Sequence, residues 1–175
     1  MPREKVKEMK YSRIRKYVII LFIIYMILLF MVLVLKFPTG MTRESIEALL
    51  SGGEIVRIKP QFVPFGTIIP YIEQAHELSD WFVKNLACNI IMFMPYGFLY
   101  PIVTRKQDCL LIRTVCSACL LSACIEIIQY ITAFGCCDID DIILNTLGAL
   151  IGFGLYRLVY KIIINLTVFQ EKEGK

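Results

Sequence analysis

The chain has 175 residues, of which 57% are hydrophobic and 19% are charged, and its formal net charge at pH 7 is +4. Soluble domains are about 45–50% apolar and about 25% charged, so this composition argues against a water-soluble globular protein. The apolar excess excludes a disordered chain, and a content of 10 Gly and 7 Pro excludes a collagen-like or low-complexity sequence. The small net charge gives no indication of nucleic acid as a partner.

Four apolar segments have the length of membrane-spanning helices, at about residues 17–35, 85–104, 113–134 and 141–162. A helix of about 20 apolar residues crosses a hydrocarbon core of ~30 Å. The first segment exceeds the apolar core of a signal peptide, which is about 7–15 residues, so we expect it to remain as an anchor. The sequence therefore predicts an all-α, polytopic membrane protein with a bundle of four transmembrane helices and a long outer loop.

Most of the 19 basic residues lie on one side of these segments. They occur before the first segment, between the second and the third, and at or after the end of the fourth. Because basic residues accumulate in cytoplasmic loops, this distribution predicts that both termini are cytoplasmic. Residues 1–16 then form a basic cytoplasmic N-terminus, residues 17–166 the membrane domain with its outer loop at 36–84, and residues 167–175 a cytoplasmic tail.

The outer loop carries two local signals. Thr42 is a suitable N-cap for a short helix that Gly52 and Gly53 would end. Residues 55–70 contain three prolines and several apolar side chains, which indicates an extended, irregular segment. We expect this segment to pack against the helix bundle or to lie in the membrane interface.

Polar residues inside the spans indicate a site. A carboxylate within a span costs at least about 2.5 kcal/mol on insertion scales, so Glu126 is expected to face the bundle interior. Ser122 and Gln129 lie on the same helical face, and Asn89 and Asn145 lie at a similar depth in the second and fourth spans. Glu126, Gln129, Asn89 and Asn145 are predicted to line an outward-facing polar pocket. The pocket would open toward three further acids: Asp138, Asp140 and Asp141.

Small residues in two spans indicate close helix packing. Gly148 and Gly152 form a GxxxG pattern, which lets helix backbones approach each other in lipid. In the second span Pro95 interrupts the backbone hydrogen bonding and can kink the helix, and Gly97 follows it. All four residues are assigned to helix packing.

Simpler interpretations of the polar residues remain open. Glu126 and Gln129 could form ordinary hydrogen bonds between helices. Any one of the acids at 138–141 could be only the N-cap of the fourth helix. Three acids within four residues exceed what a cap needs, so at least one is expected to bind something else, such as a hard cation or a cationic substrate group. The single histidine, His76, gives little support for a zinc site or a Ser-His-Asp triad.

Three sequence blocks resemble the signature blocks of the VanZ-like family. They are NIIMFMPYGF from Asn89, EIIQ from Glu126 and DIDDIILNTLG from Asp138, and Phe62-Val63-Pro64-Phe65 resembles its short outer-loop block. The resemblance implies a small protein of the bacterial cell membrane, in a family whose namesake is linked to low-level resistance to the glycopeptide teicoplanin. The motif residues carried over are Asn89, Pro95, Gly97, Glu126, Gln129, Asp138, Asp141, Asn145 and Gly148. Many members have an arginine before the last block, where this chain has Gly135-Cys136-Cys137.

Three hypotheses about function follow. The leading one is a membrane protein whose outward pocket recognises a lipid head group or a cell-wall precursor and thereby affects glycopeptide resistance. The first alternative is a metal-assisted enzyme acting on a lipid-linked substrate, with Glu126 as general acid or base and the acids at 138–141 around the metal. The second is a small transporter subunit, which would need to oligomerise. No catalytic residue, metal or cofactor is assigned.

Overall fold

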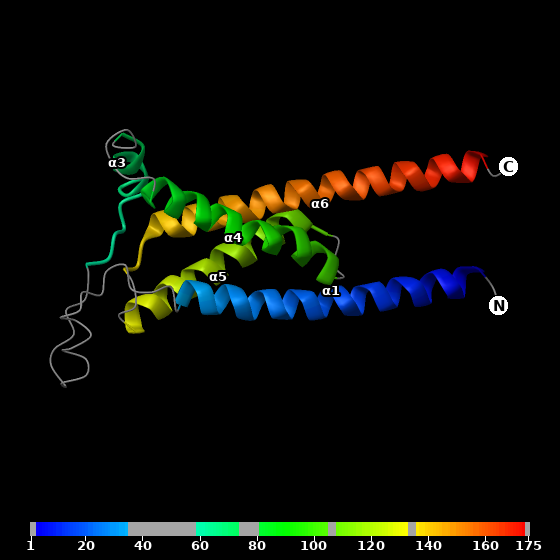
Figure 1. Ribbon diagram of the computed structural model, residues 1–175, viewed down its shortest axis with the longest axis horizontal. Helices are drawn as coiled ribbons and strands as arrows, with labels where there is room; N and C mark the ends of the chain where they lie inside the picture. Colours follow the sequence, from blue (N-terminus) through cyan, green and yellow to red (C-terminus); the bar gives the residue numbers. More distant parts are fainter. Residues whose placement is uncertain (1–2, 35–58, 74–80, 105–107, 133–135, 174–175) are drawn as a thin grey trace.

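The computed structural model describes residues 3–34, 59–73, 81–104, 108–132 and 136–173. The described chain is helical, in the order α1 (Arg3–Val34), α3 (Ile68–Glu73), α4 (Trp81–Val103), α5 (Leu110–Thr132) and α6 (Ile139–Glu173). Within these residues the only strand-like feature is an isolated parallel bridge between Gln61 and Asp138. Figure 1 shows the long helices α1, α4, α5 and α6 side by side, with the short α3 beyond one end of the bundle.

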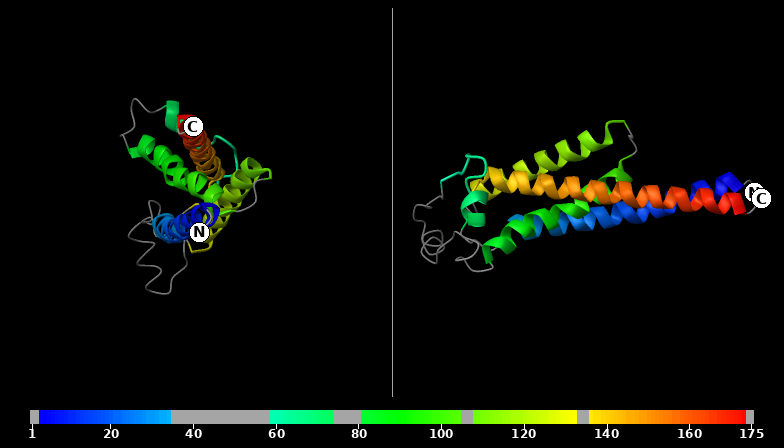
Figure 2. Two further views of the ribbon diagram at one scale, coloured as in Figure 1. Left: turned by 90° about the vertical axis from the view of Figure 1, so that its right-hand side faces the viewer. Right: turned by 90° about the horizontal axis from the view of Figure 1, so that it is seen from above.

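The four long helices confirm the predicted fold class. Each contains a segment long and apolar enough to cross a membrane: Arg13–Leu33, Leu86–Val103, Leu110–Thr132 and Ile139–Asn165. The start of α1 and the end of α6 lie at the same end of the bundle, called here the terminal end (Figures 1 and 2). The opposite end, where α5 ends and α6 begins, is called the loop end. At the terminal end α1 and α6 extend past α4 and α5.

Glycines bring α4 and α6 into backbone contact. A Cβ added at Gly148 would overlap the carbonyl of Ile90, and one added at Gly152 would overlap the carbonyl of Met94. On the other helix, a Cβ at Gly97 would overlap the carbonyl of Ala149. Small residues on both partners therefore allow the closest helix pair of the bundle, as expected for helices that must pack without a hydrophobic driving force.

Helix α1 lies along α4 and α5 but buries little of its surface. Among residues 13–33 of α1, Leu29 and Leu33 are buried, and they join the core cluster around Phe93 of α4. The Tyr25 hydroxyl donates to the carbonyl of Met92 at 2.7 Å. Most other large side chains of α1 are exposed on the single chain, which is the surface expected of a helix that faces lipid.

The loop end differs from the sequence expectation in one respect. Residues 59–67 are irregular as predicted, but α3 begins at Ile68 and includes Pro70. A proline is tolerated there because amides in the first turn of a helix have no intrahelical acceptor. The side chains of Phe62 and Val63 are exposed, so they do not hold this segment on the bundle. The helix predicted after Thr42 lies outside the described residues.

Candidate functional site at the loop end

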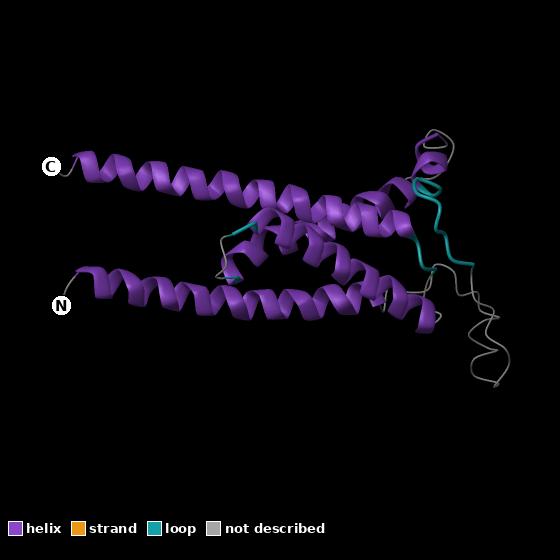
Figure 3. Cartoon of the chain, turned by 180° about the vertical axis from the view of Figure 1, so that it is seen from behind, coloured by secondary structure: helices purple, strands orange, loops and turns teal. Residues whose placement is uncertain are grey.

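Asp138 caps α6 and ties it to the loop. Its Oδ1 accepts the backbone N–H of Asp140 at 2.9 Å, the N-cap geometry expected one residue before a helix that begins at Ile139. Its Oδ2 accepts the hydroxyl of Thr67 at 2.6 Å. The backbone of Gln61 adds two hydrogen bonds, one to each sequence neighbour of Asp138: its N–H donates to the carbonyl of Cys137, and its carbonyl accepts the N–H of Ile139. Figure 3 shows the two loop segments, residues 59–67 and 136–138, in teal at the loop end of the bundle.

Asp140 holds the loop by its backbone. The carboxylate is fully buried, with an exposed fraction of 0%. It accepts the N–H groups of Phe65 at 2.6 Å, Thr67 at 2.8 Å and Ile68 at 3.0 Å. Phe65 has a positive φ of 64°, a strained conformation for a bulky residue that persists where surrounding contacts enforce it. Asp140 and residues 65–68 are called the Asp140 clasp below.

Glu126 of α5 lies against the start of α6. Its side chain is 2% exposed, and its Oε2 accepts the backbone N–H of Asp138 at 3.1 Å. The N-terminus of a helix carries a partial positive charge that favours a carboxylate at this place. The carboxylate is therefore buried inside the bundle, where it accepts a backbone N–H from the N-cap residue of α6.

Two further pairs connect the helices near Glu126. The side-chain amide of Asn89, on α4, donates to Asp141 on α6. One turn deeper, the amide of Asn145 donates to Ser122 of α5 at 2.8 Å. These five side chains, from three helices, are called the polar cluster: Asn89, Ser122, Glu126, Asp141 and Asn145.

One acceptor of the polar cluster has no hydrogen-bond partner within the described chain. The Oδ1 of Asn145 is buried and unpaired, and so is the Oγ1 of the neighbouring Thr146. A buried polar atom left unsatisfied costs about 1–3 kcal/mol. Such an atom gains free energy from a donor that reaches it, whether from water or from a ligand.

Gln129 is not part of this cluster. Its side-chain amide donates to the carbonyl of Leu33 at 2.7 Å, near the end of α1. The polar face expected on α5 therefore contacts two different neighbours. Ser122 and Glu126 bond to Asn145 of α6 and to its N-cap residue, whereas Gln129 bonds to α1.

The linker before α6 carries two free thiols, Cys136 and Cys137. Partial burial raises the pKa of both thiols above the ordinary value, because it disfavours the thiolate. The nearby carboxylates of Glu126 and Asp138 raise these pKa values further. The described residues contain no group of three or more His, Cys, Asp or Glu side chains placed to hold a metal ion.

Comparison with known proteins assigns the chain to a family. The model of the VanZ/LLP1 family matches residues 22–160. The chain belongs to the VanZ/LLP1 family. The matched region includes the whole polar cluster, the Asp140 clasp and the contact between α4 and α6. Together with the four apolar helices, family membership makes this a multi-pass membrane protein.

A curated VanZ protein is similar over part of the chain. Protein VanZ of Enterococcus faecium is 37% identical over 78 residues, which is 45% of this chain and 47% of that protein. The aligned region thus spans about half the length of the curated relative. No solved structure matches the chain.

The structure adds residues to the site that the sequence motifs do not mark. Thr67 and the backbone amides of the clasp bind the acids before α6. Ser122 lies on the expected face of α5, but only its contact with Asn145 places it in the cluster. Backbone donors have no sequence signature, because every residue except proline carries one.

Proposed function

We propose that this VanZ-family protein binds the polar group of a lipid or of a cell-wall-related molecule at the polar cluster, and that binding lowers susceptibility to the glycopeptide teicoplanin. The distribution of basic residues supports an outward orientation of the loop end, with both termini in the cytoplasm. A ligand of this class would then reach the cluster from the outer leaflet or from the cell wall.

The unpaired Oδ1 of Asn145 is the observation that carries this proposal. It lies within a cluster whose other members include two carboxylates, those of Glu126 and Asp141. An excess of acceptors favours a ligand that brings donors, such as an ammonium, amide or hydroxyl group. Amines and amides occur in phospholipid head groups and in cell-wall peptides, so the chemistry fits both sources named in the proposal.

The Asp140 clasp supports the same location. It fixes residues 65–68 against the first turn of α6, directly beside the residues that contact Glu126. A loop held in one conformation at the mouth of a site orders the approach to it, and loops positioned on a rigid scaffold often carry binding residues. The family's link with teicoplanin supplies the phenotype by which the proposal can be measured.

The test is teicoplanin tolerance in a susceptible bacterium that expresses the full chain. The variants are Glu126→Gln and Asp141→Asn, which keep side-chain shape but remove the acceptor charge. Matched controls are Glu73→Gln and Asp108→Asn, because both residues are exposed and neither takes part in the hydrogen bonds described for the cluster. We expect each cluster variant to lose most of the tolerance that wild type confers, at equal membrane abundance, and the controls to retain it.

Wild-type tolerance in both cluster variants, at normal abundance, would refute a role for the cluster. The orientation has a separate test with a membrane-impermeant thiol reagent on intact cells. Cys136 lies at the loop end, and Cys109 lies in the turn before α5. We expect labelling at Cys136 and not at Cys109, in two variants that each keep one of these thiols as the single cysteine of the chain. The reverse pattern would place the loop end in the cytoplasm.

A further inference from the structure

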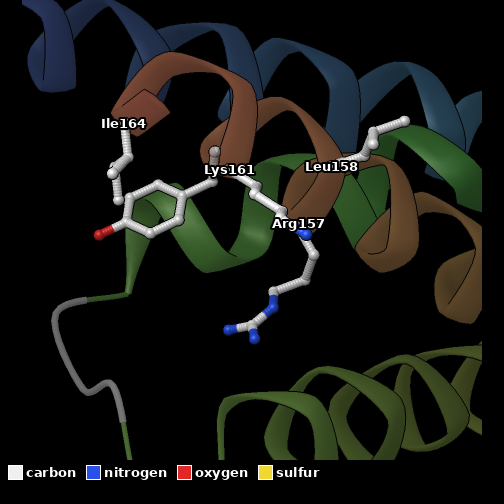
Figure 4. A pocket seen from close by; sticks show the side chains of 5 residues that line it. Arg157, Leu158, Lys161 and Ile164 are labelled. Carbon is white, nitrogen blue, oxygen red and sulfur yellow. The ribbon is translucent and has the colours of Figure 1, made fainter. Parts of the chain in front are cut away.

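A concave site lies on α6, far from the polar cluster. An open groove of about 470 Å³ is lined by two cations and three apolar or aromatic side chains: Arg157, Leu158, Tyr160, Lys161 and Ile164. Figure 4 shows the Arg157 side chain extending away from the α6 ribbon into this groove. The volume is in the range of small-molecule sites, about 300–1,000 Å³.

An apolar hollow adjoins the groove. It has a volume of about 320 Å³ between the end of α4 and α6, and its lining is Phe98, Pro101, Ile102, Tyr156, Val159, Tyr160 and Ile163. Tyr160 belongs to both linings. A groove bordered by two cationic side chains therefore continues into an apolar hollow, with Tyr160 common to both, and this combination matches the amphipathic structure of a lipid molecule.

The groove lies at the membrane boundary opposite to the polar cluster. With a rise of ~1.5 Å per residue, Arg157 and Lys161 lie about 24 Å and about 30 Å along α6 from Asp141. The hydrocarbon core is ~30 Å thick, so the two cations reach the head-group region of the leaflet at the terminal end. Long basic side chains and tyrosine are both typical of that depth.

The two cations lack an acidic partner in the described part of the chain. Helix α6 contains no Asp or Glu between Asp141 and Glu171. No carboxylate among the described residues pairs with Arg157 or Lys161. A pair of cations one helical turn apart, without a neutralising acid, favours an anionic ligand.

We propose that this groove binds one anionic phospholipid of the leaflet at the terminal end. The phosphate would accept hydrogen bonds from Arg157 and Lys161, since guanidinium and ammonium groups are the usual phosphate donors in proteins. An acyl chain would lie along the apolar hollow between α4 and α6. A soluble anion would leave these apolar walls unused, so the lining selects a phosphate that carries a hydrocarbon chain.

The experiment measures lipid retention by the purified full-length protein in native mass spectrometry. The probes are phosphatidylglycerol and phosphatidylcholine, added to the detergent-solubilised protein at equal amounts. Arg157→Gln/Lys161→Gln removes the two groove cations. The matched control is Arg13→Gln/Lys16→Gln. It removes two exposed cations of α1 from the half of the bundle toward the terminal end, where the groove also lies. We expect at least a fivefold lower fraction of phosphatidylglycerol-bound protein for the groove variant, and a change of less than twofold for the control.

Equal losses in the two double variants would overturn the proposal, because they would show only diffuse attraction to basic residues. Retention of phosphatidylcholine as strong as that of phosphatidylglycerol would also overturn it. Competition by glycerol phosphate at the same concentration as the lipid would assign the groove to a soluble anion instead. Retention of a second protein chain in place of lipid would assign it to a protein partner.

A measurement on the wild-type chain covers the case in which the groove variant fails to fold. A photoreactive phosphatidylglycerol with its label near the head group should modify residues 157–164 at least fivefold more than residues 13–16. Equal modification of the two segments would exclude a specific site. The outcome is independent of teicoplanin tolerance, so it does not depend on the function proposed for the polar cluster.

Discussion

Replacement of Asp140 by alanine should release the loop from α6. The carboxylate accepts three backbone N–H groups, at 2.6, 2.8 and 3.0 Å, and each hydrogen bond to a charged group contributes about 1.5–3 kcal/mol. The freed amides can bind water, because Phe65 is exposed and Thr67 and Ile68 are only half-buried. Allowing for this replacement, we expect a net loss of about 3 kcal/mol for the attachment of the clasp, close to one or two of these bonds.

Hydrogen exchange measures this loss directly. Because a tenfold change in an equilibrium constant corresponds to about 1.4 kcal/mol, protection of the Phe65, Thr67 and Ile68 amides should fall about 100-fold in Asp140→Ala. Asp140→Asn keeps one acceptor oxygen, so protection should fall less, by about tenfold. Asp108→Asn is the control and should change nothing at the clasp. Unchanged protection of all three amides in Asp140→Ala would refute the assignment of Asp140 as the loop's main attachment.

Three further predictions concern packing, the role of Gln129 and thiol chemistry. Gly148→Ala should lower the melting temperature in detergent, because overpacking against the Ile90 backbone costs about 1–3 kcal/mol, whereas Gly154→Ala should not, since a Cβ there meets nothing within 4 Å. Equal effects at both glycines would contradict this account of the α4–α6 contact. Gln129→Leu should lose about 0.6–2 kcal/mol of stability yet retain teicoplanin tolerance, because its amide bonds to α1; loss of tolerance at normal abundance would place Gln129 in the binding site. Alkylation of Cys136 should reach half its maximal rate at a higher pH in the folded protein than after denaturation, because burial raises the thiol pKa and less thiolate is present at any given pH; identical profiles would contradict this.

The sequence predicts the spans and the glycine contact because both depend on local patterns. The length of each apolar segment is enough to predict four membrane helices. In the structure, each of the four long helices contains a segment long and apolar enough to cross a membrane. The pattern Gly148-Ala-Leu-Ile-Gly152 predicts close approach whatever the partner helix is. The identity of that partner, α4 through Ile90 and Met94, comes only from the structure.

The hydrogen-bond partners of the three acids before and at the start of α6 could not be predicted in the same way. Asp138, Asp140 and Asp141 are almost adjacent in sequence, yet one caps the helix, one binds loop backbone and one pairs with Asn89. Their different partners depend on how residues 61–68 return to the start of α6, a contact across more than 70 residues of chain. Helical spacing likewise places Glu126 and Gln129 on one face of α5 without telling which neighbour each contacts.

The modest burial of α1 has a consequence for how this chain can vary. Its attachment depends on a short inner stripe that includes Tyr25, Leu29 and Leu33, and the family match begins at Phe22, the first described residue of α1 that packs against the core. Many other apolar residues of the α1 span, such as Ile20, Ile24 and Ile27, are exposed on the single chain and have only to be compatible with hydrocarbon. Exposed positions of the α1 span should therefore accept exchange of one apolar residue for another. Helices α4 and α6, whose backbones touch, should accept almost no added side-chain volume at Gly97, Gly148 and Gly152.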